Sequence, residues 1–168
     1  MHSKNKKIVI SALMAALVCV ATMIIKIPSP LQGYINLGDC VVLVSAWVIS
    51  PVYGFFAAGV GSALADLLSG YALYAPATFI IKGSMALIAF AICKLLQKRT
   101  PKLISRIIGG ILAECVMILG YLVFEGFLYG FGASLVNVPA NAIQGVAGIL
   151  LSIPLVKVFE RVDIIVTK

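Results

Sequence analysis

Four ionisable side chains stand inside apolar stretches of this 168-residue chain: Asp66, Lys82, Glu114 and Glu125. A charge at bilayer depth costs roughly 2.5–3.5 kcal/mol on insertion scales, so such residues usually face the interior of a helix bundle or a cavity. Carboxylates accept hydrogen bonds and an ammonium donates them, which is the chemistry of a polar binding site. The four residues are therefore the first candidates for a functional site, if the elements that carry them bring them together.

The composition indicates a membrane protein. Hydrophobic residues make up 62% of the chain and charged residues 11%, whereas soluble domains carry about 25% charged residues. A segment in lipid must satisfy its own backbone hydrogen bonds, so each span is expected to be a helix. The sequence predicts an all-α polytopic membrane protein with a single domain, residues 1–168. Its apolar runs are Ile8–Ile27, Leu37–Ile49, Val52–Leu68, Ala75–Leu96, Ile104–Leu128 and Val138–Phe159.

The basic residues set the orientation. The net charge of +7 is concentrated before the first apolar run, between Lys94 and Arg106, and around Arg161 and Lys168. Basic loops stay in the cytoplasm. The run Leu37–Ile49 is short for a span of about 20 residues and could be re-entrant. An even number of crossings must separate the first two basic clusters, so we count it as a crossing. The prediction is six transmembrane helices with both termini cytoplasmic, and membrane lipid rather than nucleic acid beside the basic residues.

This topology gathers polar side chains in the outer half of the membrane. The third and fifth runs end outside, which places Asp66 and Glu125 near that face, and Lys82 lies one to two turns into the fourth run. Asn141 and Gln144 share one face of the sixth helix. Amides beside aromatic rings suit a planar, hydrogen-bonding ligand that is neutral or weakly charged. The expected cluster contains Asp66, Lys82, Glu125, Asn141, Gln144, Tyr71, Tyr74 and Tyr129.

Each of these residues also has a structural interpretation. Asp66 and Lys82 could form an ion pair between the third and fourth helices. Glu114 lies about three turns from Glu125 and is expected to make an interhelical hydrogen bond rather than to contact a ligand. Glu125 could be solvated, and the amides of the sixth helix could join helices. Trp47 is expected in the aromatic belt at the inner interface.

No catalytic motif is present. The sequence lacks HExxH, GxSxG and the Walker lysine motif. Cys19, Cys40, Cys93 and Cys115 form no CxxC pair, and His2 is the only histidine. We therefore predict no catalytic residues, no cofactor and no metal site. If the protein drives active transport, the energy must come from another subunit.

Small residues mark two helix faces. Ala12 and Ala16 form an A-x-x-x-A pair in the first helix, and Ala57, Gly61 and Ala65 form a second ridge in the third. Small residues four apart let another helix approach closely. Either face could serve a partner subunit or internal packing.

The whole pattern resembles the substrate-binding S component of an energy-coupling factor (ECF) vitamin transporter. Several stretches resemble the riboflavin-transporter-type branch, which also holds hydroxymethylpyrimidine and pyridoxine carriers. These stretches are GYINLGD at 33–39, GVGSALADLLSGY at 59–71, APATFIIKG at 75–83 and NAIQG at 141–145. The resemblance covers essentially the full chain.

The resemblance implies a transport subunit of the bacterial cell membrane and not an enzyme. Such a subunit binds a vitamin from outside, under the loop Ile27–Leu37. Through Ala12 and Ala16 it would dock on a transmembrane coupling subunit (EcfT) that carries two ATPases (EcfA and EcfA′), and it would topple in the membrane to deliver the ligand. The implied substrate-binding residues are Lys82, Glu125, Asn141, Gln144, Tyr74, Thr78 and Asn36.

The ligand is expected to be a small pyridine or pyrimidine, such as pyridoxine or hydroxymethylpyrimidine, because one acid, one lysine and two amides form a compact polar set. Riboflavin, which needs a larger aromatic-lined cavity, is the alternative. Two other classes stay open. A membrane enzyme or assembly factor would use Asp66, Lys82 and Glu125 and turn over without ATPase partners. A self-sufficient carrier would transport when expressed alone.

Overall fold

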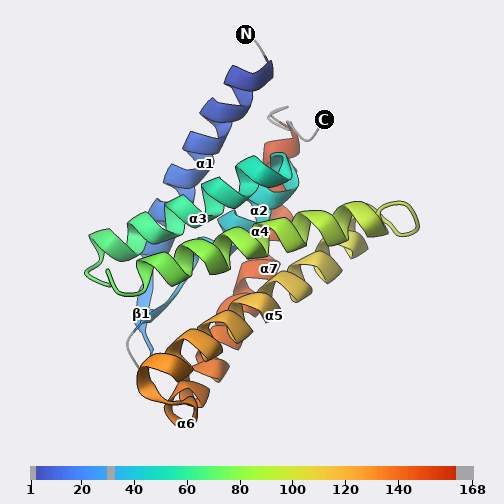
Figure 1. The fold of residues 1–168 in the computed structure, drawn as a ribbon. Coiled ribbons are helices and arrows are strands. Elements are labelled where there is room, and N and C mark those ends of the chain that lie inside the picture. The colour runs from blue at the N-terminus through green and yellow to red at the C-terminus, as the bar shows by residue number, and fades with distance from the viewer. Residues whose placement is uncertain (1–2, 30–32, 162–168) are drawn as a thin grey trace.

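The computed structural model describes residues 3–29 and 33–161. Lys168 and the middle of the loop Ile27–Leu37 lie outside these described residues. Within them, five helices are long and apolar enough to cross a membrane, in agreement with the all-α prediction. Figure 1 shows the start of the first helix and the end of the last helix on one side of the molecule, and the short helix α6 (Phe131–Ser134) on the opposite side. The long helices are α1 (Ser3–Ile24), α3 (Pro51–Leu68), α4 (Ala75–Leu96), α5 (Lys102–Tyr129) and α7 (Val138–Arg161).

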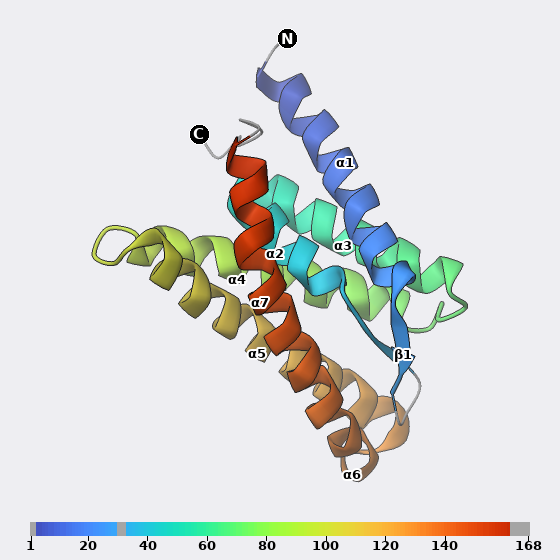
Figure 2. The same ribbon diagram turned by 180° about the vertical axis from the view of Figure 1, so that it is seen from behind.

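The remaining predicted helix, Leu37–Ile49, is α2 (Gly38–Val48), a short helix in the centre of the bundle. It has 11 residues, all of them buried. At 1.5 Å per residue it is about 16 Å long, roughly half of the hydrocarbon thickness of a bilayer. It contacts α1, α3, α4 and α7, and Figure 2 shows α7 passing beside it. The run Leu37–Ile49 is therefore a core helix enclosed by longer ones, which explains why apolar residues occupy most of its positions.

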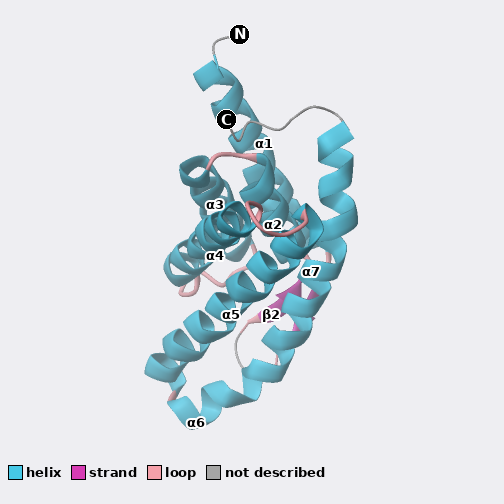
Figure 3. Ribbon diagram, turned by 90° about the vertical axis from the view of Figure 1, so that its right-hand side faces the viewer, coloured by secondary structure: helices cyan, strands magenta, loops and turns pink. Residues whose placement is uncertain are grey.

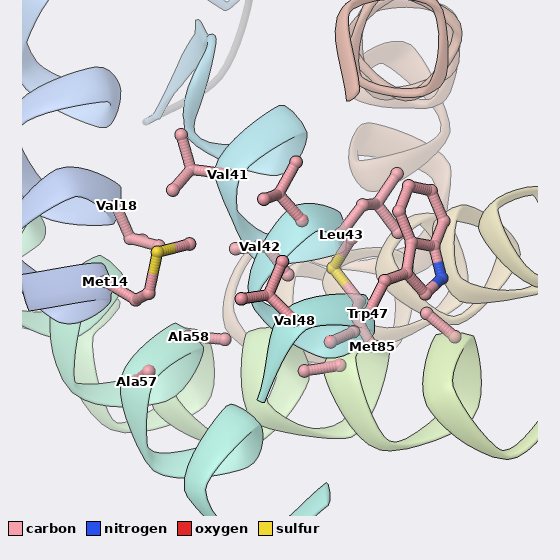
Figure 4. Close-up of a cluster of buried hydrophobic side chains, with 14 of the residues drawn as sticks. Met14, Val18, Val41, Val42, Leu43, Trp47, Val48, Ala57, Ala58 and Met85 are labelled. Atoms are coloured by element: carbon pink, nitrogen blue, oxygen red, sulfur yellow. The ribbon is translucent and has the colours of Figure 1, made fainter. Parts of the chain in front are cut away.

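Valines of α2 fill the space between the long helices. Figure 4 shows Val42 and Val48 in a cluster with Met14 of α1 and Met85 of α4; all four side chains are fully buried. Trp47 belongs to this helix as well. It was expected in the aromatic belt, but only 6% of it is exposed, and the Arg106 guanidinium carbon lies 5.5 Å from its ring centroid. The belt assignment was wrong because α2 is buried inside the bundle.

The small-residue ridge of α3 packs against α1. A Cβ added at Gly61 would lie 2.4 Å from the carbonyl oxygen of Ala15, so the two backbones touch at this point. Ala57 and Ala65, on the same ridge, are also buried, at 2% and 0% exposure. The ridge therefore serves internal packing, whereas Ala12 and Ala16 are exposed on another face of α1.

Two irregular segments contain short elements that the sequence did not reveal. Strands β1 (Lys26–Pro28) and β2 (Tyr34–Asn36) pair antiparallel, with Ile27 opposite Ile35. The expected outer loop before α7 holds α6 (Phe131–Ser134) and a 3₁₀ turn, η1 (Leu135–Asn137). In Figure 3, β2 lies beside α7. Three-residue strands give too little alternation to be recognised from sequence.

Candidate ligand-binding site

A cavity of about 40 Å³ lies where β2, the end of α3 and the outer ends of α4, α5 and α7 meet. Helix α3 ends and α4 begins at this end of the bundle, so residues distant in sequence converge here. All of the predicted substrate-binding residues except Lys82 line it. The lining residues are Ser29, Gly33, Tyr34, Asn36, Asp66, Tyr71, Tyr74, Thr78, Tyr121, Glu125, Asn137, Asn141 and Gln144.

Two buried carboxylates face this cavity, and each is satisfied through one oxygen. The Tyr34 hydroxyl donates to Asp66 Oδ1 over 2.8 Å. Tyr74 and Asn137 both donate to Glu125 Oε1, over 3.4 and 2.9 Å. Asp66 Oδ2 and Glu125 Oε2 are buried and have no partner at hydrogen-bonding geometry among the described residues. The cavity therefore presents two acceptors to whatever fills it.

Aromatic rings form one side of the cavity. The ring centroids of Tyr34 and Tyr71 are 5.0 Å apart, and those of Tyr71 and Tyr74 are 6.4 Å apart. Phe124 continues the row, 5.2 Å from Tyr74. Burial, with the nearby Asp66 carboxylate, raises the pKa of Tyr34 above its usual range. The Tyr34 phenol thus keeps its proton and remains a donor to Asp66, so this carboxylate is held in place.

Beneath the cavity, a buried network ties the loop to three helices. The side-chain amide oxygen of Gln144, Oε1, accepts a hydrogen bond from the Asn36 backbone N–H over 2.8 Å. The Gln144 amide donates to Asp39 Oδ2 over 2.6 Å, and Lys82 forms an ion pair with Asp39 Oδ1. Each link joins a different element, so β2, α2, α4 and α7 are held in one arrangement. A network with every member paired is stable, and losing one partner is costly.

Lys82 belongs to this network and not to the cavity lining. Only 3% of it is exposed, and its Nζ lies 5.5 Å from the ring centroid of Tyr121. The alternative ion pair between Asp66 and Lys82 does not form. The start of α2 brings Asp39 to Lys82 instead, while Asp66 is engaged by Tyr34. The sequence analysis did not predict this pairing, because it did not predict that α2 is buried.

Glu114 also differs from expectation. Both of its carboxylate oxygens are buried and have no hydrogen-bond partner within residues 3–29 and 33–161, so the expected interhelical hydrogen bond is missing. The side chain packs against glycines of α7: a Cβ at Gly145 would lie 3.1 Å from its Oε2, and one at Gly148 3.0 Å from its Oε1. Glu114 thus occupies the close contact between α5 and α7, next to Asp39.

Some lining residues were missed by the sequence analysis. Tyr121 and Glu125 are four residues apart on α5 and therefore share a face, a signal that could have identified Tyr121. Its hydroxyl lies 3.0 Å from that of Thr78. Tyr34 stands in the stretch GYINLGD, but its role depends on the β-hairpin. Asn137 precedes α7, and its contact with Glu125 depends on the turn η1.

Comparison with known proteins agrees with this architecture. The family model described as the S component of ECF-type riboflavin transporters matches residues 2–161. This chain belongs to that family. S components are the vitamin-binding membrane subunits of ECF transporters, and this S component is accordingly a transport protein of the membrane.

Three relatives show how far the likeness extends. The S component of a bacterial ECF transporter superposes with a TM-score of 0.75 at 28% identity, covering 94% of this chain and 97% of that one. The S component for biotin from an ECF-type ABC transporter has a TM-score of 0.66 at 19% identity, covering 94% and 92% of the two chains, and this likeness concerns the fold alone. An uncharacterized protein from the gap 3′ region of Pyrococcus woesei is 38% identical over 135 residues, 80% of this chain and 88% of its own length.

Proposed function

We propose that this S component captures a small, planar vitamin or precursor, of the hydroxymethylpyrimidine or pyridoxine type, in the cavity between β2 and α7. The main support is the pair of buried acceptors there, Asp66 Oδ2 and Glu125 Oε2, which make no hydrogen bond of ordinary geometry with the described residues. A buried acceptor without a partner costs about 1–3 kcal/mol. A ligand that brings two N–H or O–H donors removes this cost when it binds.

The ligand classes differ in how well they match these acceptors. Hydroxymethylpyrimidine carries an exocyclic amine and a hydroxyl, and pyridoxine carries several hydroxyls around one ring. Either can donate toward two carboxylates while its face lies against tyrosine rings such as Tyr71 and Tyr74. Asn141, which makes no side-chain hydrogen bond with the described residues, can add a donor or an acceptor. Lys82 contributes indirectly, because its pairing with Asp39 fixes the floor of the cavity.

The size of the cavity favours a single ring. A volume of about 40 Å³ holds about three water molecules, at ~10–15 Å³ each, so any vitamin must displace side chains as it binds. A one-ring ligand requires less displacement than the three fused rings of riboflavin. Riboflavin is the second candidate, and the description of the matching family favours it.

Delivery into the cell requires partners. We infer that the chain works in the cell membrane with the coupling subunit EcfT and two ATPases, EcfA and EcfA′, and that it performs no catalysis itself. Ala12 and Ala16 are exposed on α1, and their spacing leaves room for the backbone of a second helix. They are the proposed docking contact.

Calorimetry on the full chain in detergent tests the ligand. Hydroxymethylpyrimidine, pyridoxine and riboflavin are titrated into the wild type and into Glu125→Gln, a change of the same shape that replaces an acceptor with a donor. We expect one of the two small ligands to bind, and the substitution to weaken it more than tenfold. Binding of riboflavin alone would favour the second candidate. Equal affinity of the variant would remove Glu125 from the site.

A further inference from the structure

A second cavity lies at the other end of the bundle, beside the turn between α4 and α5. Its volume is about 230 Å³. Three cations surround it: Lys94 near the end of α4, and Lys102 and Arg106 in the first turns of α5. The acid beside them, Glu160 of α7, is already engaged by Lys102 and by Arg106, the latter over 2.7 Å. The remaining lining residues are Trp47, Phe90, Cys93 and Gln97.

Two buried donors of this cavity have no acceptor. Trp47 and Arg106 are 6% and 5% exposed, and neither Trp47 Nε1 nor Arg106 Nε has a hydrogen-bond partner in the described part of the chain. Figure 4 shows the indole nitrogen of Trp47 on the side of the ring that faces away from the valines of α2. Both donors lie at one cavity with an excess of positive charge. Phosphate oxygens satisfy such a set, because they accept several hydrogen bonds and arginine binds them well.

An apolar groove continues from the basic cavity. It has a volume of about 520 Å³ and shares Phe90 and Lys94 with it. The Lys94 ammonium lies 5.6 Å from the Phe90 ring centroid, so the boundary between the two is a cation over an aromatic face. The groove runs along the surface of α4 past the start of α3, and its other lining residues are Pro51, Leu87, Ala91, Leu95 and Lys98.

We propose that the basic cavity and the groove together bind one anionic phospholipid of the cytoplasmic leaflet. The phosphate lies between Arg106, Trp47 and Lys94, and an acyl chain lies along Leu87, Ala91 and Leu95. The position fits a lipid because the apolar span ends at Leu96 and the basic residues around the turn mark the cytoplasmic side. Basic pockets between transmembrane helices on that side are suited to anionic head groups. A free anion would leave the groove unused.

The site lies at the opposite end of the bundle from the vitamin cavity, and no residue lines both. A test can therefore show that lipid binding is absent while vitamin binding is present, or the reverse. The lipid would complete the hydrogen bonding of Trp47 and Arg106 and join α2, α4 and α5 at their cytoplasmic ends. We expect bound lipid to stabilise the folded chain by mass action.

Native mass spectrometry and thermal unfolding of the full chain test the proposal. The protein in detergent is titrated with phosphatidylglycerol, with phosphatidylcholine and with inorganic phosphate. We expect one phosphatidylglycerol to be retained and to raise the unfolding midpoint, while the same concentrations of phosphatidylcholine and of phosphate have no such effect. Equal retention of the two lipids would overturn the proposal. An equal shift with phosphate would reduce the site to one for free anions and would overturn it as well.

Variants locate the site. Lys94→Gln removes a cation that has no ion pair among the described residues, and it should weaken phosphatidylglycerol binding about fivefold. Lys157→Gln is the matched control, because Lys157 is an exposed lysine of α7 near the same end and lines neither cavity; it should leave binding unchanged. Ala91→Trp fills the groove and should reduce lipid binding further. Equal losses of phosphatidylglycerol affinity in Lys94→Gln and Lys157→Gln would show that the lipid responds only to the general positive charge of the surface.

Discussion

Asn141 offers the cleanest separation between ligand binding and folding. Its amide lines the cavity but makes no hydrogen bond with the described residues, whereas Gln144, one turn along α7, joins Asn36 to Asp39. Asn141→Ala should therefore cost the complex one or two hydrogen bonds and the fold almost none. A ligand group left without its partner costs about 1–3 kcal/mol, and every 1.4 kcal/mol is tenfold. We expect a loss of affinity of more than tenfold.

The assay combines calorimetry of vitamin binding with thermal unfolding in the same detergent. Asn141→Ala should lower the affinity and keep the unfolding midpoint of the ligand-free protein. Asn5→Ala, the same change at an exposed position of α1, should alter neither. Gln144→Ala should lower both, because it removes the hydrogen-bond partner of the buried Asn36 N–H and of Asp39 Oδ2. Unchanged affinity in Asn141→Ala would remove this face of α7 from the site and refute the reasoning.

Three further substitutions test other parts of the molecule. Ala12→Leu should abolish uptake in a complete transporter and preserve vitamin binding; if binding falls too, α1 belongs to the pocket or the fold and the docking proposal loses its support. Lys82→Met should destabilise the protein by about 3–5 kcal/mol, because it leaves Asp39 as a buried unpaired charge. Adding Asp39→Asn should recover part of the lost stability in thermal unfolding. No recovery in the double variant would contradict the pairing of Lys82 with Asp39. Glu114→Gln replaces a buried carboxyl group, which has no hydrogen-bond partner among the described residues, with an amide of the same shape that cannot place negative charge beside Asp39. The unfolding midpoint should rise by about 2–4 °C, equivalent to about 1 kcal/mol; a fall would show that the carboxyl group is needed.

The sequence predicted the parts of the fold that depend on long apolar runs. Spans such as Ala75–Leu96 need about 20 apolar residues in lipid, so their existence and order followed directly. The buried environment of α2 could not be predicted from its sequence. An apolar run of that length reads the same whether it faces lipid or the centre of a bundle, and the placements of Trp47 and Asp39 depended on this difference.

The sequence predicted the depth in the membrane at which the site residues lie, but not which of them pair with each other. Topology placed Glu125, Asn141 and Gln144 at one level, and the structure gathers them around one cavity. The partner of Lys82 could not be predicted, because Asp39 reaches it only through the β-hairpin and the short helix that follows. Tyr34 depends on the same hairpin, whose strands are three residues long.

The most direct test of the vitamin-binding role is a thermal-shift and calorimetric screen of the detergent-purified chain against B vitamins and their precursors. A ligand present at 100 times its Kd stabilises the folded state by about 2.7 kcal/mol, which gives a clear shift of the unfolding midpoint. We expect one tight ligand, with hydroxymethylpyrimidine or pyridoxine as its chemistry. No shift and no binding heat across the whole panel would contradict the assignment of the cavity to a vitamin.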